Sequence, residues 1–198
     1  MSRILVDQIR SNSASADALT LDGSGNVTFP ANATCSGTAT GFGGGKVLQV
    51  VSATKTDTTT STASSYTDIP GLAVSITPSA TSSKCLIIVS LHGTGDSNTQ
   101  WYTEIYRTSD NSSICIGDAS STRVRHSLGT AYYHQGNHIY SMSQNFLDSP
   151  NTTSAFTYKL RLRNQAGGQM TVNMSNQDYN GPESGRNAST ITVMEIGA

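Results

Sequence analysis

Histidine side chains are the first residues that could do chemistry, because neutral imidazole is a common metal ligand. His134 and His138 are four residues apart, with His126 nearby. On a strand this spacing puts two side chains on one face but ~13 Å apart, given a rise of ~3.3 Å per residue. Gly136-Asn137 between them is typical of a turn. We therefore expect no metal site and no cofactor.

The three cysteines, Cys35, Cys85 and Cys115, are an odd number at wide and irregular spacings. This pattern is not that of a disulfide framework or a zinc site. Cys85 and Cys115 lie between apolar residues, where a thiol behaves as a small buried hydrophobic group. Burial would suppress the thiolate of Cys85, so we do not expect it to act as a nucleophile.

Other catalytic patterns are missing from the sequence. It contains no Gly-x-Ser-x-Gly motif. Glu104, Glu183, Glu195 and the aspartates are too scattered to nominate the carboxylate pair of a glycosidase. A phosphate-binding loop ending at Lys46 would need glycine where Thr40 stands. We predict that the protein is not an enzyme.

Aromatic side chains could form a platform on which a host surface glycan stacks. The candidate contacts are Trp101, Tyr102, Tyr106, Tyr132 and Tyr133. In a strand over 100–107, Trp101 and Ile105 would share one face and Tyr102 and Tyr106 the other, so one face is expected in the core and one half exposed. Alternatively, these aromatics fill the core and subunit interfaces. Three polar loops are further candidates for binding: Gly93–Thr99, Asp118–His126 and Gln177–Asn187.

The elements that position these residues lie on either side of Gly41-Phe42-Gly43-Gly44-Gly45-Lys46. Glycine opens backbone conformations that other residues avoid, so this stretch predicts a joint. Residues 1–46 are predicted to form an extended arm. Residues 47–198 are predicted to form one body, long enough to bury a hydrophobic core.

The arm is small, polar and poor in large apolar side chains. Its candidate docking residues are Ile4, Leu5, Val6, Ile9, Leu19, Leu21, Val27 and Phe29. So few apolar groups cannot offset the entropy of ordering the segment, and we expect it to become ordered only on sister chains or a larger assembly. Residues 19–29 alternate on both sides of Asp-Gly-Ser-Gly-Asn, which predicts a hairpin that could pair between chains.

The body shows alternation with a period of two and no helical stripe. Ten strands are predicted: Val47–Ala53, Leu72–Thr77, Lys84–His92, Gln100–Thr108, Ser112–Gly117, Ala131–His134, Asn137–Phe146, Ser154–Arg163, Gln169–Asn173 and Thr190–Ile196. Turns are predicted between them, including Pro70-Gly71 and Gly93–Asp96. Lys84–Val89 is apolar on both faces, as expected for a central strand or one that meets a partner subunit. The pattern predicts an all-β, jelly-roll-like antiparallel β-sandwich.

Charge and terminal sequence restrict the partners. The formal net charge is −1, only 13% of residues are charged, and basic residues are not clustered, so no nucleic-acid partner is expected. The N-terminus lacks the apolar core of a signal peptide, and no segment approaches the ~20 apolar residues of a membrane span. We expect no membrane insertion, and synthesis and folding in a cytoplasm.

Several short sequence segments along the chain resemble those of a known protein family. They are Gly44–Val51, Val74–Ser79, Ser82–Ile87, Leu147–Pro150, Tyr158–Leu160 and Ser189–Ile196. Together they resemble virion structural proteins of marine tailed bacteriophages, often described as tail-fibre-like, and Leu21–Phe29 is similar to their N-terminal repeats. The resemblance implies a trimeric jelly-roll head on an extended arm. The short arm implies a fibre tip, a small appendage or a decoration on the capsid shell.

These observations predict a non-enzymatic protein of the virion, made in the host cytoplasm. It is expected to form a homotrimer and to contact other virion structural proteins through the arm. Two functions stay open. One is a tail-fibre-like or appendage protein that binds a host surface ligand such as a glycan. The alternative is a capsid decoration (cement) protein that binds only other virion proteins.

Overall fold

The computed structural model describes residues 7–9, 19–29, 46–96, 100–132, 138–165 and 167–197. The chain divides into two compact units, Met1–Gly43 and Gly44–Ala198. Every regular element in these ranges is a β-strand. None of the described residues belongs to a helix that could cross a membrane.

The first unit contains a small antiparallel sheet of β1 (Gln8–Ile9), β2 (Leu19–Leu21) and β3 (Val27–Thr28). The predicted hairpin over 19–29 is confirmed, because β2 pairs with β3. Asp22 closes the turn: its Oδ1 accepts hydrogen bonds from the backbone N–H groups of Ser24 and Asn26, at 2.9 and 2.8 Å. Strands this short leave Val27 and Phe29 exposed.

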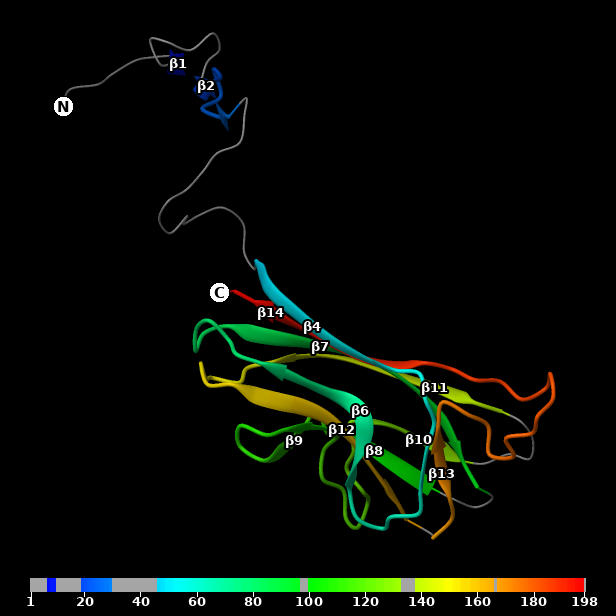
Figure 1. Ribbon diagram of the computed structural model, residues 1–198. Helices are drawn as coiled ribbons and strands as arrows, with labels where there is room; N and C mark the ends of the chain where they lie inside the picture. The colour runs from blue at the N-terminus through cyan, green and yellow to red at the C-terminus, as the bar shows by residue number, and fades with distance from the viewer. Residues whose placement is uncertain are drawn as a thin grey trace. The chain divides into compact units, whose positions relative to one another are not determined.

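The second unit consists of two antiparallel sheets packed face to face (Figure 1). One sheet has the order β4 (Val47–Lys55), β14 (Ser189–Ile196), β7 (Lys84–Gly95), β11 (Tyr140–Asp148). The other has the order β6 (Thr67–Ile76), β12 (Phe156–Asn164), β8 (Gln100–Arg107), β10 (Leu128–Tyr132). Counted along the chain, these eight strands are ordered 1-8-3-6 and 2-7-4-5, which is the jelly-roll arrangement. The predicted all-β jelly-roll sandwich is confirmed.

Three shorter strands extend these sheets. β13 (Met170–Val172) pairs with the end of β7 and with β5 (Thr59–Ser61), while β9 (Ser112–Ile114) pairs with β8. β5 is absent from the predicted strands, since its sequence is Thr-Thr-Ser and offers no apolar alternation.

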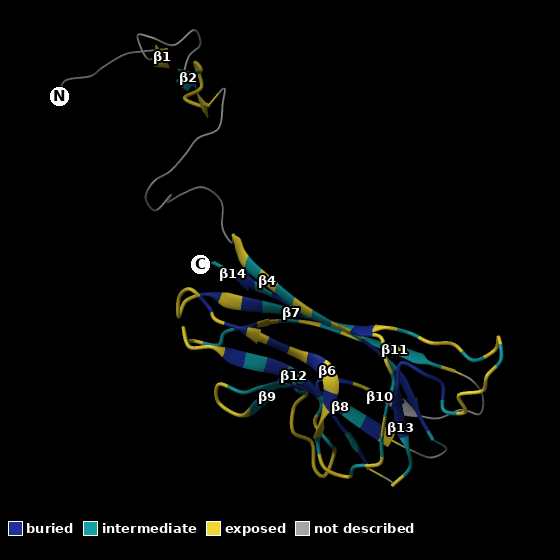
Figure 2. Cartoon of the chain, viewed as in Figure 1, coloured by how far each residue is buried: buried dark blue, intermediate teal, exposed yellow. Residues whose placement is uncertain are grey.

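The core lies between the two sheets and is built by alternation. β12 is buried at every second residue from Phe156 to Asn164, and β14 is buried at every second residue from Ser189 (Figure 2). Trp101 and Ile105 from β8 are fully buried in the same core. Burial of each such side chain contributes ~1.5–3 kcal/mol. β7 is central in its sheet, in agreement with the first of the two explanations for its apolar sequence.

Two segments predicted as turns lie inside strands. Pro70-Gly71 forms a bulge in β6, where the pairing with β12 shifts register and Gly71 has a φ of +82°. Gly93–Gly95 continues β7 and pairs with β13. At Gly93 a Cβ atom would overlap the carbonyl oxygen of Thr171 and lie 3.0 Å from Trp101. Glycine is present here because the neighbouring backbone and an indole ring approach closely, and no turn is formed.

The cysteine predictions are confirmed in part. Cys85 is buried, and both Cys85 and Cys115 are free thiols. Cys115 is only half-buried, so the prediction of a buried residue is wrong there: its backbone has a φ of +54° and its Sγ accepts a hydrogen bond from Gln144. Burial raises the pKa of the Cys85 thiol and of the Cys115 thiol. Cys35 lies outside the described residues.

Candidate interaction surfaces

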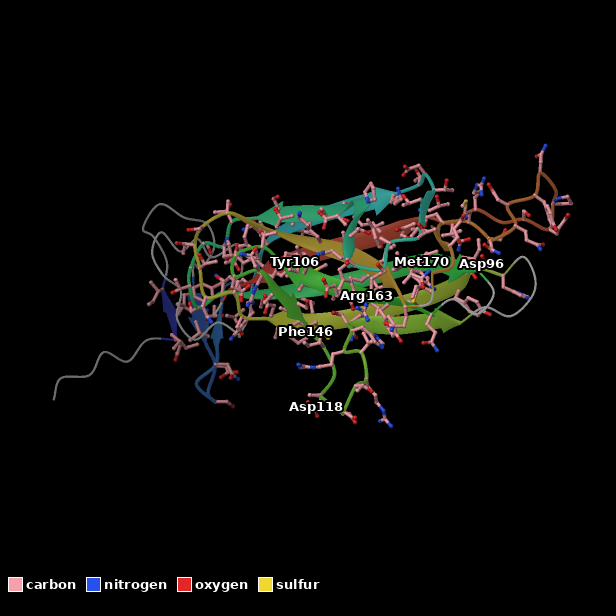
Figure 3. All side chains as sticks on the ribbon, turned by 90° about the horizontal axis from the view of Figure 1, so that it is seen from below. Asp96, Tyr106, Asp118, Phe146, Arg163 and Met170 are labelled. Carbon is pink, nitrogen blue, oxygen red and sulfur yellow. The ribbon has the colours of Figure 1, made fainter. Side chains whose placement is uncertain are left out.

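The outer face of the β6–β12–β8 sheet carries tyrosines interleaved with charged residues. We call this set the Tyr–Arg face: Tyr66, Asp68, Tyr102, Glu104, Tyr106, Lys159, Arg161 and Arg163. The strand register brings residues that are far apart in sequence into rows, with Arg163 opposite Tyr102 and Lys159 opposite Tyr106. In Figure 3 Arg163 and Tyr106 belong to this sheet, while the loop that carries Asp118 projects away from the sandwich.

Two guanidinium groups lie over the tyrosine rings of this face. The Cζ of Arg161 is 4.4 Å from the ring centre of Tyr106 and 5.9 Å from that of Tyr66. The Cζ of Arg163 is 5.4 Å from the ring centre of Tyr66 and 5.5 Å from that of Tyr102. Each cation–π contact contributes ~0.5–1 kcal/mol at an exposed site and holds the guanidinium in place.

The cations on this face differ in their partners. Arg161 lies 3.2 Å from a carboxylate oxygen of Glu104, and Lys159 lies 2.8 Å from one of Asp68. Arg163 donates from Nη2 to the side-chain oxygen of Gln165 at 2.7 Å. Its Nε is buried and has no hydrogen-bond partner among the described residues. Arg163 is thus a positioned cation that no carboxylate among the described residues neutralises.

The neighbouring rings are held by polar contacts. Tyr102 donates its hydroxyl hydrogen to Gln100, and its ring lies 5.2 Å from that of His126. Tyr106 donates its hydroxyl hydrogen to Asn111. Burial raises the pKa of the Tyr66 phenol, and the charge of Glu104 raises it further.

The structure separates the five aromatic residues proposed as glycan contacts. Trp101 is fully buried in the core and is unable to reach a ligand, which corrects its assignment as a contact. Tyr102 and Tyr106 lie half-buried on the opposite face of β8. The backbone of Tyr132 pairs with Gln100, and Tyr133 lies outside the described residues. Sequence analysis missed Tyr66 and the two arginines, because they join the tyrosines only through strand order.

The histidines do not form a metal site in the described ranges, where no three His, Cys, Asp or Glu side chains gather in a ligand arrangement. Nδ1 of His126 contacts the carbonyl oxygen of Leu128, and His138 is exposed. His134 lies outside the described residues.

A second surface lies on the outer face of the other sheet. Val50, Met194, Leu86 and Leu147 stand opposite one another on β4, β14, β7 and β11. Val50 and Leu147 are each 54% exposed. We call this cross-strand set the apolar row. Figure 2 shows the beginning of β4, next to this row, as largely exposed.

Three of the four residues in the adjacent row, which faces inward, are polar. It consists of Gln49, Glu195, Cys85 and Asp148, again opposite one another on the same four strands. Glu195 and Asp148 are both buried. This end of the sheet therefore has acidic groups inside and apolar groups outside, the reverse of the usual arrangement for a sheet with one solvated face.

Hydrogen bonds explain how the buried acids are tolerated. Glu195 accepts from the backbone N–H and the hydroxyl of Ser79, at 2.7 and 2.6 Å, and from the side-chain amide of Gln49 at 2.6 Å. Burial raises the pKa of Glu195, but the hydrogen bonds from Gln49 and Ser79 outweigh it and lower the pKa to about 2. Asp148 accepts from Tyr158 and Arg107, and burial together with this hydrogen bond raises the pKa of Tyr158.

Of the arm residues proposed for docking, those that the structure describes are exposed or half-buried. Ile9, Val27 and Phe29 are exposed, and Leu19 and Leu21 are half-buried. Ile4, Leu5 and Val6 lie outside the described residues. The docking role of these arm residues stays a prediction.

Comparison with known proteins gives no family. No protein-family model matches the chain, and no curated protein sequence matches it. Three solved structures of infectious bursal disease virus are similar to it. The VP2 subviral particle is 13% identical with a TM-score of 0.39, covering 75% of this chain and 39% of that chain. The structure of the Gt strain is 16% identical with a TM-score of 0.40, covering 91% of this chain and 45% of that chain. The structure of the Gx strain is 13% identical with a TM-score of 0.40, covering 85% of this chain and 46% of that chain. The chain thus spans less than half the length of each of these proteins.

Proposed function

We propose that this protein is a non-enzymatic structural component of a tailed-bacteriophage virion. The observation that carries the proposal is the end of the β4–β14–β7–β11 sheet, where the apolar row points outward and the buried acids point inward. Four apolar side chains in one cross-strand row favour burial against another chain, since exposed apolar groups gain ~25 cal/mol per Å² when they leave water.

The free edge of this sheet supports the same proposal. Among the described strands, β4 pairs with β14 alone, so the N–H and C=O groups of its other edge meet no strand. Val47 and Leu48, at the beginning of β4, are exposed. An edge strand with apolar side chains is a template for association unless another chain covers it. We propose that a second copy covers the edge and the apolar row in a symmetric, trimeric head.

The arm is proposed to attach this head to other virion proteins. Its small sheet leaves Ile9, Val27 and Phe29 exposed, and strands of two or three residues are too short to be stable alone. A surface on another virion protein would cover these side chains. The resemblance to virion structural proteins of marine tailed phages supports the same role.

The place on the particle decides between the two functions. We favour a tail-fibre-like or appendage protein whose head faces a host surface, because the Tyr–Arg face offers rings and an unneutralised cation to a ligand. The alternative is a capsid decoration protein, for which only contacts with virion chains are needed.

Immunogold labelling of the phage that encodes this chain tests the proposal. Label on the tail or its tip supports an appendage, and label spread over the shell supports a decoration protein. Absence of the chain from purified particles, checked by mass spectrometry, would sink both. A phage that encodes the chain from Lys46 onward should assemble without incorporating it.

A further inference from the structure

Arg163 is the residue of the Tyr–Arg face with the strongest reason to meet a ligand. The face holds three cations, Lys159, Arg161 and Arg163, against the two carboxylates of Asp68 and Glu104. Both carboxylates are engaged, by Lys159 and Arg161. Within the Tyr–Arg face one positive charge is left over, and it is on Arg163.

The hydrogen-bond geometry of Arg163 suits an oxyanion. Arginine forms charge-assisted hydrogen bonds with a carboxylate or sulfate. Nη2 of Arg163 donates to Gln165, an exposed residue, while the Nε is buried and out of a ligand's reach. A carboxylate or sulfate that replaced the amide oxygen of Gln165 would accept from Nη2.

The tyrosines position this arginine before any ligand arrives. The Tyr66 and Tyr102 rings lie at 5.4 and 5.5 Å from its Cζ. The same rings offer apolar surface beside the cation, and sugar rings have an apolar face that stacks on aromatic rings. A ligand that combines a negative charge with a sugar ring therefore fits better than a free anion.

We propose that the Tyr–Arg face binds an acidic carbohydrate, with Arg163 pairing with its carboxylate or sulfate group and Tyr66 and Tyr102 contacting its ring. This inference rests on the proposed function in one respect: a head that faces a host surface meets such sugars. It is independent of where the arm attaches. The rival occupant of this face is a second copy of the chain.

Binding of the full chain to three polysaccharides tests the proposal. The probes are polysialic acid, which carries carboxylates, heparin, which carries sulfates, and neutral dextran, all at physiological ionic strength. We expect binding to at least one acidic probe and none to dextran. The Arg163→Gln variant should bind that probe about 10- to 100-fold more weakly, the loss that follows from removing a charged hydrogen-bonding pair.

Lys84→Gln is the control, because it removes one positive charge at an exposed position of the other sheet while leaving every residue of the Tyr–Arg face in place. It should change affinity by no more than about threefold, since distant exposed charges are screened. Equal losses in the two variants would show nonspecific attraction and overturn the proposal. So would absence of binding to both acidic probes.

Oligomer mass and thermal unfolding of each variant complete the test. If Arg163→Gln unfolds at the temperature of the wild type and keeps its mass, its loss of binding belongs to the ligand site. If the oligomer of Arg163→Gln has a lower mass than the wild-type oligomer, the face is an interface between copies and the proposal is wrong. Failure of carbohydrate binding leaves the virion labelling experiment untouched, so the two proposals can fail separately.

Discussion

Arg107 and Asp148 join the two sheets of the sandwich, with Nη1 of Arg107 lying 2.7 Å from both carboxylate oxygens of Asp148. Arg107 ends β8 and Asp148 ends β11, and their side chains are 14% and 7% exposed. Tyr158 donates a further hydrogen bond to Asp148 at 2.6 Å. Asp148→Asn would remove the buried carboxylate that accepts from Arg107 and Tyr158, and only the more exposed Asp110 would still compensate the charge of Arg107. We expect a loss of about 1.5–3 kcal/mol in the free energy of unfolding, measured by urea denaturation.

Asp110 provides the control for this prediction. It contacts the same Arg107 at 2.6 Å, but its side chain is 47% exposed. The hydrogen bond from Arg107 is the main reason that the pKa of Asp110 is lowered to about 2. Asp110→Asn should cost less than about 1 kcal/mol, because exposed ion pairs are weak. Equal losses for the two variants would show that burial of the pair is unimportant.

Glu195 should make the stability of the sandwich depend on pH in acid. Its pKa is lowered from 4.5 to about 2, so the ionised carboxylate is stabilised more in the folded state than in the unfolded chain. This contribution is complete above pH 4.5 and is lost as the pH falls toward 2. Glu195→Gln should lower the stability at neutral pH by about 1.5–3 kcal/mol, the usual contribution of hydrogen bonds to a charged group. It should also flatten the fall in stability between these two pH values.

Glu183→Gln serves as the comparison, because Glu183 is exposed on a loop of the same body. Urea unfolding of both variants at several pH values between 2 and 7 gives the test. If the free energy of unfolding of Glu195→Gln falls between pH 4.5 and 2 as steeply as that of the wild type, other carboxylates cause the acid sensitivity.

Gly93 should be intolerant of a side chain. A Cβ atom there would overlap the Thr171 carbonyl and press on Trp101, so β7 and β13 would have to separate. Gly93→Ala should lower the free energy of unfolding by about 1–3 kcal/mol, as overpacking does. Gly129→Ala is the matched change in β10, where nothing lies within 4 Å of the added methyl group. Its effect should stay within about 0.5 kcal/mol, and a similar loss in both variants would refute the explanation.

The apolar row should matter for assembly more than for folding. Leu147→Gln places a polar group at a 54% exposed position, which a monomer would tolerate. In a trimer built on this face, the change should weaken association and lower the mass seen by light scattering at micromolar concentration. Asn145→Gln, two residues earlier on the same exposed side of β11, should leave the mass unchanged. Reduced stability of Leu147→Gln with unchanged mass would count against the proposed interface.

The sandwich could be predicted from sequence because alternation reports which face of a strand is buried. Phe156–Asn164 alternates strictly, and its predicted strand is correct to within two residues at the start and one at the end. Turns were predicted wrongly at two places where glycine or proline has another structural role. Gly93 allows two backbones to approach, and Pro70-Gly71 makes a bulge within β6.

The candidate sites could be predicted only in part. Alternation correctly placed Trp101 and Tyr102 on opposite faces of one strand, but the partners of Tyr102 come from distant segments. Tyr66 and Arg163 are almost one hundred residues apart, and only the order β6–β12–β8 brings them together. The buried acids Glu195 and Asp148 carry no local signal either, because their hydrogen-bond partners Ser79 and Arg107 are 116 and 41 residues away in the sequence.

The most direct test of the assembly is the solution mass of the full chain and of a version that begins at Lys46, by light scattering on a sizing column. We expect trimers for both, because the proposed interface lies on the sandwich, which has its own core, and the arm serves for attachment. A monomeric full chain would contradict this prediction. The apolar row would then have no second copy to cover it, and a single-copy clamp on the capsid shell would replace the trimeric head.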